Sequence, residues 1–528
     1  MRNRLITGIG LSNYKTLDEY TFIPIKDITT LIGKNGSGKS SCWQVLSLLS
    51  NLNQDYRPND PDAHKYLLIE SLLSLNKFKE YAGNAAALLS NKTKPLIIEL
   101  SSNFLVLDTF INNEELLLRF EFIDYKEELK ISSFEFFTKE GKHLLWEVRF
   151  NPDNSCYEGE FSDYFGQFIL NVLYKISNKD YEKKSKDFFE LVRDLENLKT
   201  HDISSILIDC DESFFDYSLQ KVQIYQKWGE KFSDFVILVK DQLQFEIPKI
   251  KISESHLFQE MAELILEALK GTFFELLNEI KDCIYVNRQL IGTPTRFISK
   301  TNEQELYLID LEKSIIAKDL RKEFIKFILR TKKTFNFKEI PRITDDDTGD
   351  FLLIKLDTED LRNSGSGYWS LTYILQVISH AVRSKKRIII LEEPEAHLHP
   401  DFQAKLADFL IDASKTFLIT FIVETHSEYL TRRMQIRVFE AHNKIEIENP
   451  TLQVNHLLEY SNPNGIKLDK ENVIINYFKH SSERVEGMPI CINIQISETG
   501  MLSSAYPLTF AGVANADAKI LFDLKSRL

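Results

Sequence analysis

A glycine-rich stretch near the amino terminus has the residue types and spacing to hold phosphate groups. Residues 33–40 read GKNGSGKS and fit the pattern G-x-x-x-x-G-K-[ST] in full. The glycines let the backbone curl so that its N–H groups point at the phosphates, and the following helix adds partial positive charge. Lys39 would reach the β- and γ-phosphates, and Ser40 would bind Mg²⁺. The residues expected to contact the nucleotide are Gly33, Asn35, Gly36, Ser37, Gly38, Lys39, Ser40 and Ser41.

A pair of carboxylates far along the chain could complete this chemistry. Residues 388–391 are all apolar, as in a buried strand, and are followed directly by Glu392 and Glu393. Successive strand residues point in opposite directions, so the two acids have separate tasks. We assign Glu392 to the Mg²⁺ ion and Glu393, as a catalytic residue, to the attacking water. This assignment expects Lys39 and Glu393 on neighbouring strands, in contact with the same triphosphate.

The elements that position these residues can be traced from hydrophobic spacing. From about 95 to 148, short apolar stretches are separated by the turn signals INNEE (111–115) and KEGKH (139–143), which predicts an antiparallel meander. Residues 165–335 have mostly helical spacing. From residue 351 onward, apolar strands alternate with helices, beginning with DFLLIKL (351–357). That alternation indicates a parallel sheet covered on both faces.

Two further stretches carry a resemblance to a known group of proteins. They are EEPEAHLHP (392–400) and FIVETHSEYLTRR (421–433). Together with the glycine-rich stretch they resemble the ABC-type ATPase head of the SMC, RecF and overcoming-lysogenization-defect (OLD) group. The resemblance implies that His426 is a catalytic residue that contacts the γ-phosphate. The stretch YVNRQLIGTPTRF (285–297) is also similar, and makes Arg288 and Arg296 candidates for a phosphate or interface role.

The resemblance further implies that the site is completed by a second copy of the chain. In this group a glycine loop before the helix that leads to the acidic strand provides the signature motif. Residues 363–367 occupy that place here, with Ser364, Gly365 and Gly367 as the contacting residues, although Trp369 stands where many relatives have serine. Two ATP molecules would then be held between two heads.

His397 and His399 leave an alternative open. Two histidines with acids nearby could bind zinc. Within the resemblance, the H-x-H stretch is instead the loop that crosses the dimer interface.

The sequence thus predicts an α/β fold, an ABC-type P-loop ATPase head with an antiparallel β subdomain and a large, mostly helical insertion. Lys39 and Glu393 belong to two separate halves of that head. The expected parts are the first half of the head (1–50), a helix with the antiparallel subdomain (51–164), the helical insertion (165–284), the second half of the head (285–440) and a small C-terminal domain (441–528).

The function that the resemblance implies is an ATP-hydrolysing molecular switch. The chain also resembles short prokaryotic ATPases of anti-phage systems, of the Septu type (PtuA) and their retron-associated relatives, through ETHSEYL and the C-terminal stretch 491–524. There a separate HNH nuclease is the effector. ATP and Mg²⁺ are the expected cofactors, and a second copy of the chain and such an effector are the expected partners.

Two rival functions remain. An OLD-type nuclease requires a metal-binding Asp-x-Asp pair after the head, and the sequence has none after residue 436. An ATP-binding scaffold with negligible hydrolysis would use the same residues as an active ATPase.

The amino-acid composition limits the kinds of partner that we expect the protein to bind. The formal net charge is −13, so an acidic surface would repel nucleic acid unless a local basic patch or a partner binds it. Five scattered cysteines without a C-x-x-C pair argue against a disulfide framework. The sequence contains no apolar run of membrane-spanning length and begins without a signal-peptide pattern, so we expect a cytoplasmic protein without a membrane partner.

Overall fold

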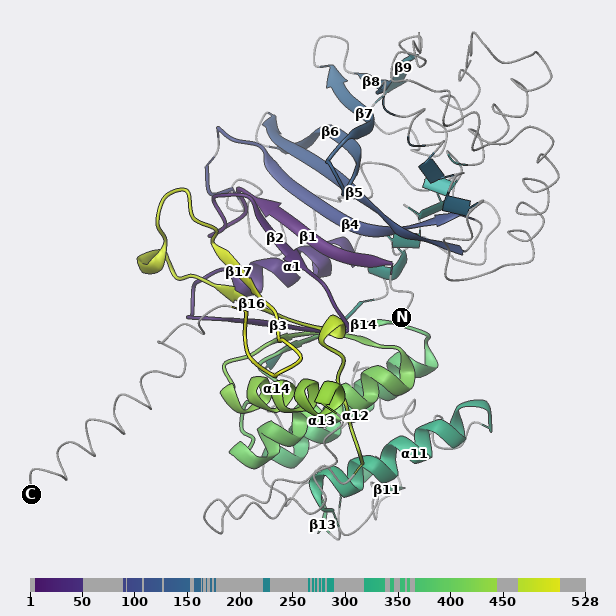
Figure 1. Ribbon diagram of the computed structural model, residues 1–528, viewed down its shortest axis with the longest axis vertical. Coiled ribbons are helices and arrows are strands. Elements are labelled where there is room, and N and C mark those ends of the chain that lie inside the picture. Colours follow the sequence, from purple (N-terminus) through teal and green to yellow (C-terminus); the bar gives the residue numbers. More distant parts are fainter. Residues whose placement is uncertain are drawn as a thin grey trace, which may run out of the picture. The chain divides into compact units, whose positions relative to one another are not determined.

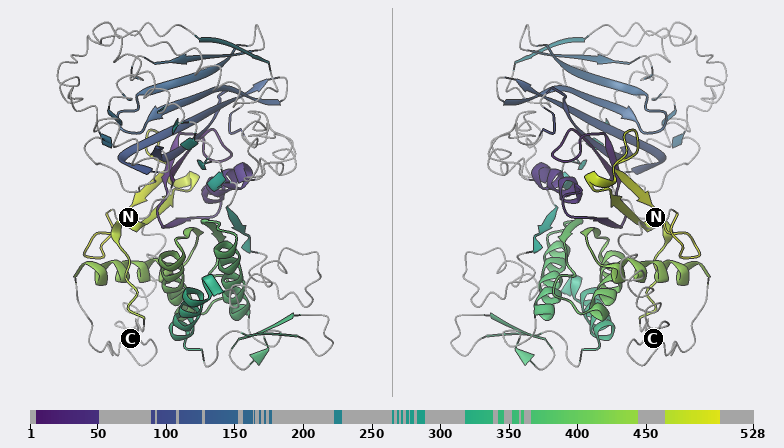
Figure 2. Two further views of the ribbon diagram at one scale, coloured as in Figure 1. Left: turned by 90° about the vertical axis from the view of Figure 1, so that its right-hand side faces the viewer. Right: turned by 90° about the vertical axis from the view of Figure 1, so that its left-hand side faces the viewer.

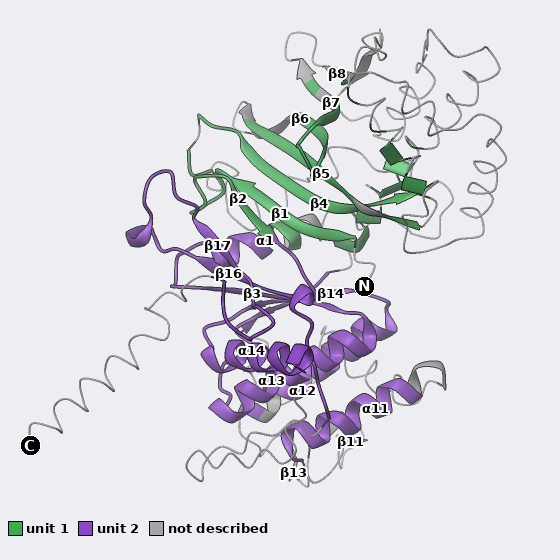
Figure 3. Cartoon of the chain, viewed as in Figure 1, with its two compact units in different colours: residues 1–23, 44–281 green, residues 24–43, 282–528 purple. Residues whose placement is uncertain are grey.

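The computed structural model (Figures 1 and 2) contains two sheets of six strands or more and a layer of helices. It describes residues 5–50, most of 89–162, single residues of 164–176 and 265–288, and residues 222–227, 318–337, 342–345, 352–356, 359–360, 366–443 and 464–503. The chain divides into two compact units, each made of two segments (Figure 3). Unit 1 comprises residues 1–23 and 44–281, and unit 2 comprises residues 24–43 and 282–528.

Unit 1 is built on an eight-stranded sheet with the order β2-β1-β4-β5-β6-β7-β8-β9. From β1 to β9, each pair of neighbours is antiparallel. The strands are β1 (Ile6–Ser12), β2 (Thr21–Pro24), β4 (Leu96–Val106), β5 (Thr109–Tyr125), β6 (Glu128–Thr138), β7 (Leu144–Asn151), β8 (Cys156–Phe161) and β9 (Val222–Lys227). The predicted antiparallel meander is therefore confirmed.

One of the two predicted turns is wrong. The stretch 139–143 is a turn, with Gly141 at φ 73° and a hydrogen bond from the Thr138 N–H to the His143 carbonyl. The stretch 111–115 instead lies inside β5, where Glu115 pairs with Asn103 of β4. The register of β4 with β5 shifts between Asn103 and Leu105, so this stretch is an irregularity within a strand and not a turn that separates two strands.

The described residues of the predicted helical insertion agree with helical spacing. Phe168, Val172 and Ile176 are buried at intervals of four, as are Ile265 and Leu269. This spacing places each set on one face of its helix. Strand β9 is an exception to the predicted helical character, and apart from it and the single residues described within 164–176 and 265–284 the range 165–284 lies outside the described residues.

Unit 2 carries a six-stranded sheet with the order β10-β14-β15-β3-β16-β17. Its first five strands are parallel and the last is antiparallel. The strands are β10 (Ile284–Val286), β14 (Ile388–Glu392), β15 (Thr420–Glu424), β3 (Ile28–Gly33), β16 (Val473–Phe478) and β17 (Cys491–Ile494). Every residue of β3, β15 and β16 is buried, as expected for central strands covered on both faces.

Helices cover the two faces of this sheet. The bounds are α1 (Lys39–Ser50), α11 (Lys318–Phe335), α12 (Ser366–Arg383), α13 (Pro400–Phe417) and α14 (Glu428–Asn443). Figure 1 shows α12, α13 and α14 on one face and the start of α1 on the other. At the start of α13, Pro400 occupies the first turn and the His399 ring accepts a hydrogen bond from the Asp401 N–H.

The predicted small C-terminal domain differs from the structure. Among the residues described within 441–528, β16 pairs with β3 along its whole length, from Val473 opposite Ile28 to Phe478 opposite Gly33. These residues therefore belong to the sheet of the head. The mostly apolar character of β16, in which Asn476 is the exception, is explained by its central place, since both of its faces are buried.

The strand expected at 351–357 is present but does not belong to the parallel sheet. Strand β12 (Leu352–Leu356) lies between β11 (Arg342–Asp345) and β13 (Glu359–Asp360) in a small antiparallel sheet, outside the parallel one. The predicted α/β class with an antiparallel subdomain is confirmed. No helix in the described part of the chain is both long and apolar enough to cross a membrane.

Candidate functional site

The phosphate-binding loop predicted from the sequence connects β3 to α1. Gly33, Gly36 and Gly38 have φ angles of 147°, 75° and 108°, in the region that favours glycine. At Gly33 a Cβ atom would also lie 2.4 Å from the Phe478 carbonyl oxygen of the neighbouring strand β16. The loop conformation thus depends on local glycines and on the strand that packs beside them.

Lys39 is buried beneath this loop. Its Nζ donates hydrogen bonds to the carbonyl oxygens of Gly33 (2.9 Å) and Lys34 (3.1 Å), and lies 3.8 Å from Glu424 Oε1. Burial lowers the pKa of Lys39, while the carboxylates of Glu424 and Glu393 act in the opposite direction. The ammonium group therefore lies at the loop, within the field of two acids.

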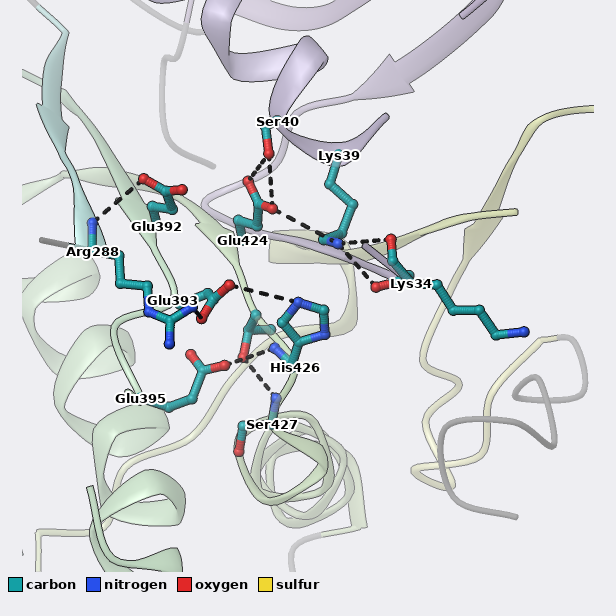
Figure 4. Close-up of polar contacts among 12 residues, drawn as sticks. Lys34, Lys39, Ser40, Arg288, Glu392, Glu393, Glu395, Glu424, His426 and Ser427 are labelled. Carbon is teal, nitrogen blue, oxygen red and sulfur yellow. Dashed lines mark hydrogen bonds and ion pairs between the residues drawn. The ribbon is translucent and has the colours of Figure 1, made fainter. Parts of the chain in front are cut away.

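Ser40 contacts an acid that sequence reasoning missed. Its Oγ lies 3.0 Å from each carboxylate oxygen of Glu424, the last residue of β15 (Figure 4). Trp43 Nε1 donates a further hydrogen bond to Glu424 Oε2 at 2.7 Å. Burial raises the pKa of Glu424, and the contacts with Trp43, Lys39 and Ser40 oppose that rise. The available signal was its position at the carboxyl end of an apolar strand, directly before Thr425-His426.

Glu392, which we predicted to bind the metal, has different neighbours. Its Oε2 accepts hydrogen bonds from the Tyr285 hydroxyl (2.6 Å) and from the Arg288 backbone N–H (3.4 Å). Tyr285 follows the first residue of β10 and stacks on Trp43, with ring centroids 4.2 Å apart. Glu392 and Glu424 pair in the register of β14 and β15. The metal role of Glu392 stays a prediction, with Glu424 as the carboxylate in contact with Ser40.

Glu393 lies immediately after β14 and points toward His426. Its φ of 44° is in the left-handed region, and its N–H donates to the Glu424 carbonyl at 2.8 Å. One carboxylate oxygen lies 2.8 Å from Arg288 Nη1 and the other 3.7 Å from His426 Nε2. The sharp turn after the strand thus brings the predicted water-activating acid and the predicted γ-phosphate contact together (Figure 4).

A second missed residue holds the backbone of His426. Glu395 Oε1 accepts a hydrogen bond of 2.7 Å from the His426 N–H. Glu395 is buried, which raises its pKa, and its Oε2 has no hydrogen-bond partner among the described residues. Burial also lowers the pKa of His426, and the positive charges of Lys39 and Arg288 contribute to this shift. Glu395 is therefore a positioning residue for His426.

The C-terminal segment also contacts the phosphate-binding loop. Lys34 Nζ lies 2.6 Å from Glu483 Oε1, and Arg484 Nη2 donates to the Ser37 carbonyl oxygen at 3.1 Å. Tyr477 donates its hydroxyl to Glu483 at 2.8 Å. These contacts were not predicted from the sequence, because they depend on β16 lying next to β3.

Gly367 and His399, two further residues named from the sequence, have their contacts elsewhere. Ser364, Gly365 and Arg296 lie outside the described residues. Gly367 is in the first turn of α12, where an added Cβ would meet the His397 carbonyl and the Leu398 side chain. His399 caps α13, and no cluster of three or more metal-binding side chains occurs among the residues that are described.

The expectation that Lys39 and Glu393 follow neighbouring strands is wrong. Strand β15 lies between β3, which leads to Lys39, and β14, which leads to Glu393. The two residues still interact electrostatically, because the parallel strands end at the same edge. The inserted strand explains why Glu424, rather than a residue of β14, contacts Ser40.

The donor set around Ser40 fits a magnesium ion. Mg²⁺ prefers oxygen ligands, and usually takes one or two from protein carboxylates while phosphates and waters supply the rest. The Ser40 hydroxyl and the Glu424 carboxylate are such donors, and Glu392 ends the adjacent strand. A site that shares the metal with a bound triphosphate therefore needs no dedicated protein cage.

Comparison with known families gives a match over most of the chain. Residues 5–431 match the family described as "AAA ATPase domain". The chain belongs to this family. It is thus an ATP-binding and ATP-hydrolysing protein.

No curated protein matches this AAA ATPase in sequence. Among solved structures, it is similar to an SMC head bound to the C-terminal winged-helix domain of ScpA, with 13% identity, 94% of this chain and 99% of that chain covered, and a TM-score of 0.37. The SMC head of Pyrococcus furiosus bound to the C-terminal domain of ScpA has 16% identity, coverage of 81% and 91%, and a TM-score of 0.31. The Thermotoga maritima SMC head domain has 11% identity, coverage of 81% and 92%, and a TM-score of 0.29.

Proposed function

We propose that this AAA ATPase is a molecular switch that closes in pairs around ATP and opens after hydrolysis. The observation that carries the proposal is the meeting of Lys39, Ser40 and Glu424 at the loop with Glu393 and His426 beside it. Cation, hydroxyl, acid and imidazole at one sheet edge are the groups that phosphoryl transfer to water requires.

In this proposal Glu393 orients the attacking water and accepts its proton. His426 Nε2, 3.7 Å from Glu393, is placed to donate a hydrogen bond to a γ-phosphate oxygen. Lys39 exchanges its carbonyl partners for phosphate oxygens. Mg²⁺, held through Ser40 with Glu424 and Glu392, would neutralise charge on the phosphates.

The pairing of heads follows from the loop at 363–367. Ser364, Gly365 and Gly367 of one copy would contact the triphosphate held by the other copy. Because the γ-phosphate then bridges two copies, its release removes a contact that holds them together. A partner that prefers the closed pair is thereby coupled to ATP binding.

The partner is proposed to be a separate effector, such as an HNH nuclease, in an anti-phage complex. This part rests on the sequence resemblance given above. Nucleic acid would be reached through a local basic patch or the effector, since the net charge of the chain is −13.

Phosphate release and oligomeric state test the proposal together. The wild type should release phosphate from ATP with Mg²⁺, and Glu393→Gln should lose at least ~100-fold in rate, as expected for loss of a general base. The same variant should accumulate as a dimer with ATP in size-exclusion chromatography. Glu428→Gln, which changes an acid in the first turn of α14, is the control and should hydrolyse normally. A monomeric Glu393→Gln variant with saturating ATP would contradict the pairing.

An ATP-binding scaffold with little hydrolysis is the second candidate. It is favoured by the ion pair between Arg288 and Glu393, because a carboxylate oxygen that contacts a guanidinium is not available to hold a water molecule. If purified wild type binds ATP but releases no phosphate above the Lys39→Ala variant, the scaffold explains the site better.

A further inference from the structure

Arg288 contacts both Glu393 and Glu392, the first through its side chain and the second through its backbone. Its Nη1 lies 2.8 Å from Glu393, and its backbone N–H donates to Glu392. We propose that Arg288 is a γ-phosphate sensor, which neutralises Glu393 until ATP binds and then exchanges that carboxylate for the γ-phosphate. This inference rests on the proposed ATPase site and adds to it a residue that discriminates ATP from ADP.

The backbone of Arg288 is held in a fixed place. Strand β10 runs parallel to β14, with Val286 opposite Leu391, so Arg288 and Glu393 both follow two residues later. Tyr285 anchors the strand by its hydrogen bond to Glu392 and its stacking on Trp43. Rotation of the arginine side chain alone can therefore change its partner.

The ion pair is exposed enough to be exchanged. The Arg288 side chain is 53% exposed and that of Glu393 is 20% exposed. Exposed ion pairs contribute only about 0–1 kcal/mol, because water screens them. A guanidinium also forms planar, bidentate contacts with phosphate, so a doubly charged terminal phosphate competes well with one carboxylate.

The surrounding charges place a phosphate within reach of the arginine. Arg288 Nη1 and His426 Nε2 lie 2.8 Å and 3.7 Å from the two oxygens of the Glu393 carboxylate, so both groups face the same acid. A triphosphate that reaches Lys39 and His426 thus brings its γ-phosphate to the region that Arg288 faces (Figure 4). ADP lacks that group, so the ion pair would persist.

The exchange has a consequence for catalysis. Release from Arg288 leaves the Glu393 carboxylate free to hydrogen-bond the attacking water. Activation of the base is then tied to the presence of the γ-phosphate. After phosphate leaves, Arg288 can pair with Glu393 again, and hydrolysis stops until the next ATP binds.

Calorimetry with a non-hydrolysable ATP analogue and with ADP, both with Mg²⁺, tests the sensor. Arg288→Ala should weaken binding of the analogue by ~10-fold or more, a loss of about 1.4 kcal/mol, and change ADP binding by less than about twofold. Arg288→Lys keeps the positive charge without the planar guanidinium group. Its affinity for the analogue should therefore lie between those of the wild type and Arg288→Ala. Arg149→Ala is the matched control, because Arg149 is 66% exposed and lies 2.9 Å from Glu147 in the antiparallel sheet.

A double-mutant cycle isolates the exchange from a general loss of positive charge. Glu393→Gln removes the competing carboxylate, so it should strengthen analogue binding in the wild-type background and leave it unchanged in Arg288→Ala. Equal weakening of analogue and ADP by Arg288→Ala, or no weakening, would overturn the sensor. If Arg288→Ala does not fold, Arg288→Lys and the Glu393→Gln comparison decide the question. If the wild type binds neither nucleotide, the proposed ATPase site itself fails.

Discussion

Ser40 and Glu424 are 384 positions apart in the chain, and the Ser40 hydroxyl lies 3.0 Å from both oxygens of the Glu424 carboxylate. Trp43 fixes the carboxylate through a third hydrogen bond. A hydroxyl and a carboxylate held together at the start of this helix are oxygen donors of the kind that Mg²⁺ prefers. The acid beside the loop is thus on β15, one strand nearer than the sequence had indicated.

Glu424→Gln should uncouple magnesium from ATP hydrolysis. The amide keeps the size of the side chain but not its charge, so we expect the Mg²⁺ concentration for half-maximal activity to rise ~10-fold or more, while nucleotide affinity without Mg²⁺ changes little. Magnesium titrations of phosphate release measure this. Trp43→Phe, which retains the ring but loses the N–H, should give a smaller shift in the same direction. An unchanged magnesium requirement in Glu424→Gln would show that Glu424 does not serve the ion.

Alanine at Gly33 should destabilise the protein more than alanine at Gly36. Both positions have positive φ, which costs an L-residue about 1 kcal/mol. At Gly33 the added Cβ would also lie 2.4 Å from the Phe478 carbonyl, whereas at Gly36 it meets nothing within 4 Å. Thermal unfolding of the two variants compares the costs directly. Equal losses in melting temperature would contradict a close approach of β16 to the loop.

Glu395 should affect turnover through His426 rather than through nucleotide binding. Glu395→Gln retains an oxygen that can accept the His426 N–H, so its kcat should stay within about threefold of wild type. Glu395→Ala removes the acceptor and should lower kcat by ~10-fold or more with KM for ATP nearly unchanged. Steady-state kinetics of the two variants separates positioning from bulk stability, and equal losses in both would contradict the assignment.

The same residue should give a pH dependence of stability. Burial raises the pKa of Glu395 in the folded state, so the folded protein holds the proton more tightly than the unfolded chain does. Its contribution to stability is therefore present below the unfolded pKa of about 4.3 and declines as pH rises through the higher folded pKa. Glutamine does not titrate. The stability of Glu395→Gln relative to wild type should thus increase from pH 4.5 to pH 7, as measured by urea unfolding.

Arg437 should be essential for the packing of α14 on α13. Its side chain is fully buried, donates to both carboxylate oxygens of Asp408 at 2.6 and 2.7 Å, and bonds Glu440 at 2.8 Å. Arg437→Met removes the buried cation shared by the two acids, leaving Asp408 with only its 3.3 Å contact to Arg433, and should cost about 3–5 kcal/mol in the free energy of unfolding. Denaturant unfolding measures the loss. The double variant Arg437→Met with Asp408→Leu should recover part of it.

The sequence by itself determined the loop, because the loop is a local structure. Gly33, Gly36, Gly38 and the helix that begins at Lys39 are consecutive in the chain, and their conformations follow from glycine chemistry and a helix start. The apolar runs that became β14 and β15 were equally local signals. The class of fold and the antiparallel meander followed from such patterns.

Only the tertiary structure decided which distant residues meet. The order of strands is a long-range property, so β15 between β14 and β3 placed Glu424 rather than Glu392 on Ser40. The entry of β16 beside β3 assigned the C-terminal residues to the head, and the pairing of β10 with β14 brought Arg288 to Glu393. Hydrophobic periodicity determines which faces of a strand are buried but not which strand lies beside it. The order of the strands arises from packing over the whole sheet.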